Sequence, residues 1–315
     1  MQYATKRASS EARGETSAVL QPESNPMVKW TASSEQITLA DGTGLHYADY
    51  GSGAPVLLVH GWAASGAFFD ALAQALAKDV RVIIPDLRAH GETAAGESAL
   101  TIDRLADDMA ELIAALDLKH VVVLGWSMGA MVLWRLIARH GDERLAGMIV
   151  EDMSPRVLNN GDWSLGMSNG LDDVASDRAV RSMRSNWPAY ARAFTPRIFA
   201  RNRASSDPDM IAWSLNRIQT LDPEAMASLW ISLTEQDLRQ ELPAITVPTL
   251  VTYGECSDAY GPETSRYLVE TLPNAWTKGF ARSGHAPHME EAEEFARAVL
   301  EFARQVRPGG KQANE

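Results

Sequence analysis

Short apolar runs alternate with amphipathic stretches over most of the chain. Because each run is continuous rather than interrupted by polar residues, it predicts a strand that is buried on both faces of a sheet. The runs lie at residues 56–59, 82–84, 121–124, 145–150, 249–253 and 276–280. Strands of this kind are typical of a parallel sheet that helices cover on both sides.

Helical spacing separates these runs. In residues 102–118, Leu105, Met109 and Leu112 recur on one helical face, and Thr101 precedes them as a suitable N-cap. Further helices are predicted at residues 68–77 and 291–306.

Two short segments before the first buried run predict an antiparallel hairpin. Residues 37–39 and 45–50 flank a turn-forming cluster at 41–44. Together with the six apolar runs, the hairpin predicts an α/β fold with a mostly parallel eight-stranded sheet and helices on both of its faces.

The alternation stops between residues 153 and 242, where the pattern becomes helical and four tryptophans occur, Trp163, Trp187, Trp213 and Trp230. We interpret this segment as a helical cap, inserted where it would roof the carboxyl ends of the strands. The expected organisation is a disordered leader at 1–29, a core at 30–152 and 243–306, the cap at 153–242 and a flexible tail at 307–315. Met27 is an alternative start.

A serine stands where one of the apolar runs passes into a helix, in the sequence Gly-Trp-Ser-Met-Gly at residues 125–129. A sharp turn at Ser127 requires small residues two positions before and after it, and Gly125 and Gly129 meet that requirement. Such a turn would present the Ser127 hydroxyl clear of the sheet. The motif is short and occurs by chance, so its surroundings decide its meaning.

Three further motifs accompany this turn. His60-Gly61-Trp62 follows one apolar run, Asp86 to Gly91 follows the next, and Ser283-Gly284-His285-Ala286-Pro287 follows the last. In this order the motifs resemble the α/β-hydrolase superfamily, over residues 36 to about 306. The resemblance implies Ser127 as nucleophile and His285 as its base, with His288 as a rival for the second role.

The same resemblance implies two backbone donors for an oxyanion, the amides of Trp62 and Met128. His60 is expected to support its loop by hydrogen bonding. Asp86, Arg88 and His90 correspond to a structural turn of the superfamily, so we expect no chemical role for them.

Two carboxylates compete for the third place in the triad. One common position in the superfamily is a Gly-x-x-Asp pattern, yet the chain has Ser257 at the third place after Gly254, and Asp258 comes one residue late. Another arrangement puts the acid directly after the preceding strand, where the chain has Asp152. Esterases with that arrangement often show a serine at the later position, so we favour Asp152 and keep Asp258 as the alternative. Glu151 and Glu255 rank below both.

Substrate contacts are expected from aromatic side chains, namely Trp62 and the cap residues Trp163, Trp187 and Trp213, although a helical cap also needs tryptophans for its own core. Residues 178–203 contain seven arginines and no acidic residue. These arginines favour either a carboxylate-bearing substrate or a solvated helix face. The arginines in this segment are Arg178, Arg181, Arg184, Arg192, Arg197, Arg201 and Arg203.

The composition limits the partners and the cellular compartment that we expect. A formal net charge of −12 and a pI near 5.1 argue against nucleic acid or an anionic membrane as partner. The single cysteine, Cys256, cannot form an internal disulfide, and no apolar leader is evident, so we expect a cytoplasmic protein. We expect no cofactor and no metal, because His and acidic residues show no ligand spacing. The oligomeric state stays open.

These features predict a serine hydrolase that cleaves an ester, lactone or thioester of a small to medium, apolar or aromatic substrate through an acyl-enzyme. A carbon–carbon bond hydrolase or a cofactor-free perhydrolase with the same triad is the alternative within that class. A binding or signalling protein of the same fold is the alternative outside it.

Overall fold

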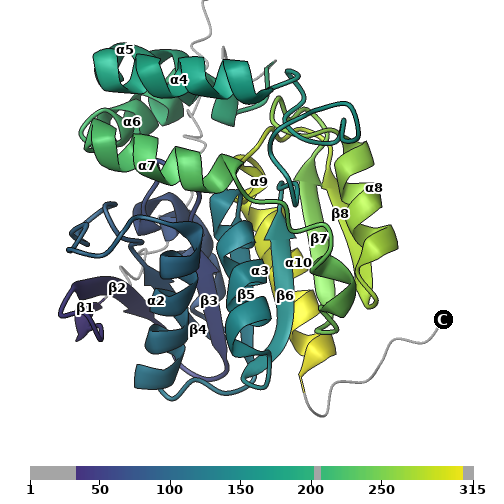
Figure 1. Ribbon diagram of the computed structural model, residues 1–315. Coiled ribbons are helices and arrows are strands. Elements are labelled where there is room, and N and C mark those ends of the chain that lie inside the picture. Colours follow the sequence, from purple (N-terminus) through teal and green to yellow (C-terminus); the bar gives the residue numbers. More distant parts are fainter. Residues whose placement is uncertain (1–32, 202–206, 308–315) are drawn as a thin grey trace, which may run out of the picture. The chain divides into compact units, whose positions relative to one another are not determined.

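The computed structural model describes residues 33–201 and 207–307. Their central feature is an eight-stranded sheet with the order β1-β2-β4-β3-β5-β6-β7-β8 (Figure 1). β1 pairs antiparallel with β2 and β2 antiparallel with β4, whereas all other neighbours are parallel. The strands are β1 Ser33–Thr38, β2 Gly44–Tyr50, β3 Pro55–Val59, β4 Arg81–Pro85, β5 Val121–Trp126, β6 Leu145–Glu151, β7 Thr249–Gly254 and β8 Ala275–Phe280. The predicted fold class is confirmed.

Helices cover both faces of this sheet. α2 packs against α3, and α1 packs against α10 on the other face (Figure 1). The central strand β5 is buried at every position, which its uninterrupted apolar sequence dictates. The core helices are α1 Asp70–Leu76, α2 Ile102–Ala115, α3 Met128–His140, α8 Pro262–Thr271, α9 Pro287–Glu290 and α10 Ala292–Val306.

Three predicted boundaries differ from the structure. α2 ends at Ala115 rather than at residue 118, because Asp117 adopts a left-handed backbone with φ 44°. The closing helix α10 begins at Ala292, one residue later than predicted, and the short helix α9 before it was not predicted; between them, the Glu291 carboxylate accepts hydrogen bonds from Arg282 N and Ser283 Oγ. β1 starts at Ser33 and is almost wholly exposed, so its polar sequence carries no burial pattern.

The helical cap follows β6 and lies above the carboxyl ends of the strands (Figure 1). Each of its four α-helices begins after an Asp or Asn whose side chain accepts a hydrogen bond from a first-turn amide. The elements are α4 Asp173–Ser185, α5 Trp187–Phe194, the 3₁₀ helix η2 Thr195–Ile198, α6 Pro208–Ile218 and α7 Pro223–Thr234. Two short 3₁₀ helices, η1 Gly66–Phe69 and η3 Leu242–Ala244, lie in the core.

The two connections between cap and core run side by side. Arg156 and Asp237 form an isolated antiparallel bridge, and Leu238 N donates to Pro155 O at 3.0 Å. The indole of Trp62 donates to Met226 O of α7 at 3.0 Å. The cap is thereby joined to the core at these paired segments, residues 155–156 and 237–238, which we call the neck, and through α7. The bounds 153–242 stay a prediction, and the predicted leader and the tail beyond Arg307 lie outside the described residues.

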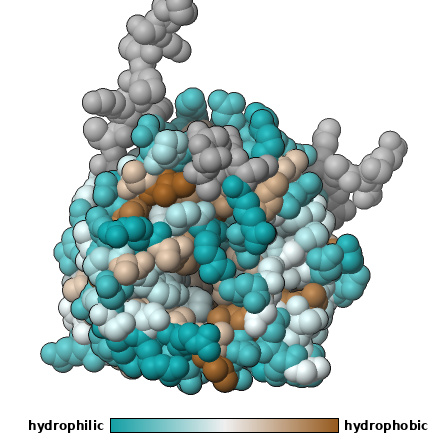
Figure 2. All heavy atoms as spheres, turned by 90° about the horizontal axis from the view of Figure 1, so that it is seen from above, coloured by the Kyte–Doolittle hydropathy of each residue, from teal (hydrophilic) through white to brown (hydrophobic). Residues whose placement is uncertain are grey.

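Seen from above, the surface is mostly hydrophilic, with small separate apolar patches between polar side chains (Figure 2). Val174 is the exposed large hydrophobic residue among those that the structure describes. No described helix has both the length and the apolar character needed to cross a membrane.

Candidate active site

Ser127 sits on the turn between β5 and α3 with φ 53° and ψ −122°. This strained backbone depends on the flanking glycines, because a Cβ on Gly125 would lie 2.4 Å from Ala130 N and one on Gly129 would lie 2.1 Å from Val59 O. The Ser127 amide donates to Glu151 O at 2.9 Å, which fixes the turn against β6. The packing therefore gives a physical reason for the glycine spacing of the motif.

His285 and Asp152 are joined directly. Nδ1 of His285 lies 2.6 Å from Oδ2 of Asp152, and Ser257 Oγ donates to the same oxygen at 2.6 Å. Asp152 follows β6 in a left-handed backbone conformation, φ 47°, and its amide donates to Thr252 O. Because the Nδ1–H of His285 faces a carboxylate, Nε2 is the nitrogen left to accept a proton.

The structure does not bring Asp258, the alternative acid, to His285. Its carboxylate forms an ion pair with Arg201 and lies in the wall of a cavity. Glu255 is exposed.

Glu151 and His288 form a second pair behind the first. Oε1 of Glu151 accepts hydrogen bonds from His288 N at 3.0 Å and from His288 Nδ1 at 2.8 Å, and both side chains are fully buried. The His288 ring packs against Phe69 and Trp126, with centroids 4.6 and 4.8 Å away. His288 therefore has no exposed edge from which to serve as base.

Two predicted oxyanion donors lie beside Ser127. Met128 is the first residue of α3, where backbone amides have no partner within the helix and the helix dipole favours negative charge. The loop with Trp62 passes close to the nucleophile, because a Cβ on Gly61 would lie 3.2 Å from Ser127 Cβ.

Two buried histidines hold that loop in place. His60 Nδ1–H donates to Gly61 O at 2.8 Å while its Nε2 accepts from Leu87 N at 3.0 Å. His90 Nε2 accepts from Ala63 N at 3.2 Å. Burial lowers the pKa of His60 to about 4 and that of His90 to about 3, so both rings are neutral as these bonds require.

The turn that contains Asp86 and Arg88 is tied into the core. Asp86 accepts from the amides of Gly66 and Glu92. Arg88 is fully buried and forms ion pairs with Asp108 at 2.5 Å and Asp41 at 2.8 Å. The Arg88 guanidinium holds the pKa of Asp41 well below its usual range.

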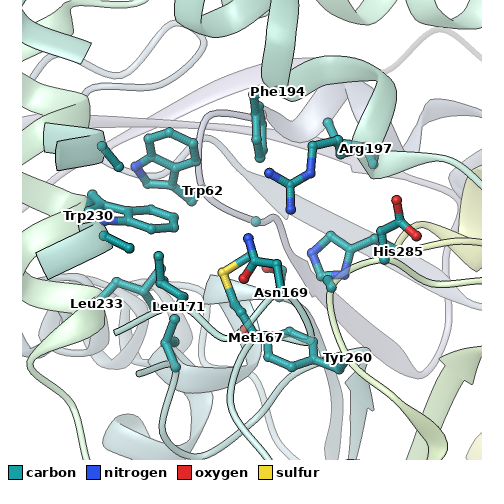
Figure 3. A pocket seen from close by; sticks show the side chains of 18 of the residues that line it. Trp62, Met167, Asn169, Leu171, Phe194, Arg197, Trp230, Leu233, Tyr260 and His285 are labelled. Carbon is teal, nitrogen blue, oxygen red and sulfur yellow. The ribbon is translucent and has the colours of Figure 1, made fainter. Parts of the chain in front are cut away.

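A cavity of about 320 Å³ opens in front of Ser127 and His285, beneath the cap. Its wall is largely apolar and comes from both core and cap (Figure 3). The labelled wall residues in Figure 3 are Trp62, Met167, Asn169, Leu171, Phe194, Arg197, Trp230, Leu233, Tyr260 and His285.

Of the four tryptophans expected at the substrate, only Trp62 is among the described residues that line this cavity. Trp187 donates to Ile218 O, Trp163 donates to Arg156 O, and Trp213 packs against Phe68 with Arg217 above its ring. These three serve the packing of the cap and its neck instead. Trp230 of α7, which was not expected, does line the cavity.

Comparison with known proteins defines the family. A model of the alpha/beta hydrolase fold matches residues 54–292, which is most of the chain. The chain belongs to the α/β-hydrolase family.

Several α/β-hydrolases are similar over most of their length. A non-heme chloroperoxidase of Kitasatospora aureofaciens is 29% identical over 271 residues, covering 84% of this chain and 98% of that protein. The pimeloyl-[acyl-carrier protein] methyl ester esterase of Vibrio cholerae is 27% identical over 259 residues, covering 82% and 98%. The solved esterase EaEST of Exiguobacterium antarcticum superposes with a TM-score of 0.80 at 25% identity, covering 86% and 99%.

In this α/β-hydrolase, the described residues contain no group of three or more His, Cys, Asp or Glu side chains placed to hold a metal ion. Most of the apolar wall was not predicted from the sequence, and Trp126 and Trp230 are its two unpredicted tryptophans. Trp126 lies inside the serine motif itself, which was the available signal. α7 is buried on nearly every side, so its sequence gives no stripe that marks the position of Trp230.

Proposed function

We propose that this α/β-hydrolase is a serine hydrolase that cleaves carboxylic esters of small to medium apolar or aromatic compounds through an acyl-enzyme. One observation carries the proposal: His285, whose Nδ1 lies 2.6 Å from the buried Asp152 carboxylate, lines the same cavity as the strained Ser127. An imidazole oriented by a buried carboxylate is the arrangement that activates a neighbouring hydroxyl.

In the proposed reaction, Ser127 Oγ attacks the ester carbonyl and its proton passes to Nε2 of His285. The tetrahedral intermediate collapses, the C–O bond to the alcohol breaks, and His285 returns the proton to the leaving oxygen. Water then adds to the acyl-enzyme with the same histidine as base, which releases the acid and restores Ser127. Asp152 keeps Nδ1 protonated and stabilises the imidazolium.

The amides of Met128 and Trp62 would bind the negative oxygen of each intermediate. Removing such a donor costs other enzymes about 10²- to 10³-fold in kcat, so the placement of these amides would contribute substantially to the rate. Support comes from the place of Met128 at the start of α3 and from the two neutral histidines that fix the loop before Trp62.

A fluorophosphonate probe tests the proposal. Ser127 is expected to displace fluoride from the probe and become labelled, and Ser127→Ala is expected to lose both the label and, by about 10³-fold or more, turnover of p-nitrophenyl esters. Rates measured with lactones and thioesters in the same panel show which class of acyl compound the protein hydrolyses. Folded wild-type protein that neither labels nor turns over any of these compounds would instead favour a binding or signalling role.

One relative supports a second acceptor for the acyl group, hydrogen peroxide in place of water. The Kitasatospora protein is described as a non-heme chloroperoxidase. Hydrogen peroxide attacking the acyl-enzyme in place of water would release a peracid, with no cofactor and with the same proton transfers. Peracid formation from an ester and peroxide, abolished in Ser127→Ala, is the expected result; release of acid alone contradicts it.

A further inference from the structure

The cavity wall carries an unbalanced positive charge. Arg178, Arg197 and Asp258 are the arginines and the carboxylate among the described residues that line the cavity. The carboxylate of Asp258 already forms an ion pair with Arg201, which does not line the cavity. Within residues 33–201 and 207–307, no carboxylate forms an ion pair with either Arg178 or Arg197. The described wall of this cavity therefore has two exposed arginines without a carboxylate partner, in a chain with net charge −12.

Arg197 is held beside the catalytic histidine by its backbone. It lies in η2, and the next residue, Ile198, accepts a hydrogen bond from the amide of His285 at 2.9 Å. Two residues further on, Ala200 N donates to Oε1 of Glu290, whose Oε2 accepts from Gly284 N at 2.6 Å.

Close packing reinforces this connection. A Cβ on Gly284 would lie 2.4 Å from Ala200 N, so the glycine before His285 lets the cap backbone pass. These contacts hold the backbone that follows Arg197 against the loop that contains His285.

The Arg197 side chain is directed into the cavity. Figure 3 shows its guanidinium between Phe194 and His285, with Trp62, Trp230 and Leu233 on the opposite side. Burial raises the pKa of Tyr190 to about 12 while the charge of Arg197 acts against that rise, so this phenol is neutral next to the guanidinium. The cavity thus has an aromatic side and a cationic side.

A neutral ester would leave that cation without a partner. Arg197 is an exposed residue of η2, yet it lines the cavity, and a guanidinium binds a carboxylate there through two parallel hydrogen bonds. We propose that Arg197 binds a carboxylate carried by the ester, so that the preferred substrates are anionic esters with an apolar remainder; this rests on the proposed function. The carboxylate belongs to either the acyl or the alcohol portion.

Two matched pairs of esters test the proposal and distinguish these portions. 4-Acetoxybenzoate against phenyl acetate places the charge on the alcohol portion, and monoethyl succinate against ethyl butanoate places it on the acyl portion. The measured quantity is the ratio of kcat/KM for the anionic ester to that for its neutral partner, in wild type, Arg197→Gln and Arg192→Gln. Arg192 of α5 is exposed, as Arg197 is, but lies outside the cavity wall, which makes it a matched charge control.

In Arg197→Gln the ratio is expected to fall about 10- to 100-fold for one pair, mainly through KM, because a charge-assisted hydrogen bond is lost. The pair affected identifies the portion that carries the carboxylate. In Arg192→Gln the ratio is expected to stay within about 2-fold, because this charge lies outside the cavity and meets the substrate only through solvent. Ratios that are the same in wild type and Arg197→Gln for both pairs would overturn the inference while the proposed function stands.

A binding measurement distinguishes failure of the Arg197 proposal from failure of the proposed function. If wild type hydrolyses none of the four esters and takes no fluorophosphonate label, the proposed function fails, and calorimetry with benzoate and with succinate still decides the role of Arg197. A dissociation constant about 10-fold higher in Arg197→Gln than in wild type supports the carboxylate site. Equal constants, or no binding of either acid to wild type, overturn it.

Discussion

Two histidine–carboxylate pairs lie side by side in this protein, and they differ mainly in what surrounds them. Glu151 and Asp152 are consecutive at the end of β6, and their partners His288 and His285 are three residues apart. The His285 side chain is 12% exposed and lines the cavity, whereas Glu151 and His288 are 0% exposed.

The difference shows that pairing alone does not make a catalytic base. In the inner pair, Glu151 Oε2 and His288 Nε2 have no hydrogen-bond partner among the described residues. Aromatic rings enclose that nitrogen, so no substrate can reach it. We therefore interpret the inner pair as a brace between β6 and α9, and the outer pair as the chemical one. The following experiments test whether the two pairs have these different roles.

The largest effect is expected at the outer carboxylate. Asp152→Asn should lower kcat for an activated ester by about 10³- to 10⁴-fold, because His285 loses the partner that fixes its tautomer. Asp258→Asn is the matched control and should change kcat by less than about 10-fold, since its carboxylate is paired with Arg201. A collapse of kcat in the control alone would transfer the role to Asp258.

At the inner pair we expect loss of stability rather than loss of chemistry. Glu151→Ala should reduce the free energy of unfolding by about 3 kcal/mol, because the amide and ring N–H of His288 stay buried without an acceptor. Glu151→Gln keeps an acceptor oxygen there and should lose less. Denaturant unfolding measures this cost. If Glu151→Ala, assayed where it is still folded, loses as much kcat as Asp152→Asn, the brace interpretation is wrong.

Acid should expose a further contrast between accessible and buried imidazoles. His60 and His90 have folded-state pKa values of about 4 and 3, below the ordinary value of 6.5. The unfolded chain therefore binds more protons below pH 6.5, so stability falls as the pH drops from there towards 4. The slope from these two groups reaches at most about 2.7 kcal/mol per pH unit.

Unfolding titrations between pH 7 and 4.5 measure this slope. In His90→Gln, the side-chain oxygen can also accept a hydrogen bond from the Ala63 amide but has no proton to gain in this pH range. This variant should show a shallower slope of unfolding free energy against pH than wild type. Equal slopes in the two proteins would mean that His90 is not buried in its neutral form.

The smallest effect is expected at Ser257, whose hydroxyl donates to the outer carboxylate where the inner one accepts from a backbone amide. Ser257→Ala removes the hydrogen bond to Asp152 Oδ2 and should lower kcat about 3- to 10-fold. Ser257→Thr keeps the hydroxyl and should retain more activity. No change of kcat in Ser257→Ala, with unchanged thermal unfolding, would show that Asp152 does not depend on this donor.

Sequence reasoning was strongest where the backbone itself imposes the residue. Gly125 and Gly129 can be inferred from the turn at Ser127, and the structure shows which atoms a side chain would strike. The fold class followed from continuous apolar runs. The choice between Asp152 and Asp258 depended on a family resemblance, because spacing alone does not say which loop turns towards His285.

The cap was harder, because its contacts are tertiary. Trp163, Trp187 and Trp213 have the same composition signal as Trp230, yet only Trp230 reaches the cavity wall among these four. Which side a tryptophan faces depends on how α4 to α7 pack together, and no single helix pattern contains that information. The partnership of Glu151 with His288 likewise needs the sheet and α9 to be placed first.

The bond network around Glu290 also sets a limit for protein engineering. One carboxylate receives an amide from the insertion at Ala200 and another from the loop at Gly284. Transplanting a foreign lid onto this scaffold at the neck alone would remove the hydrogen bonds that Ala200 and Ile198 make to Glu290 and His285. The smallest module that can be exchanged intact thus includes both the insertion and residues 283–290.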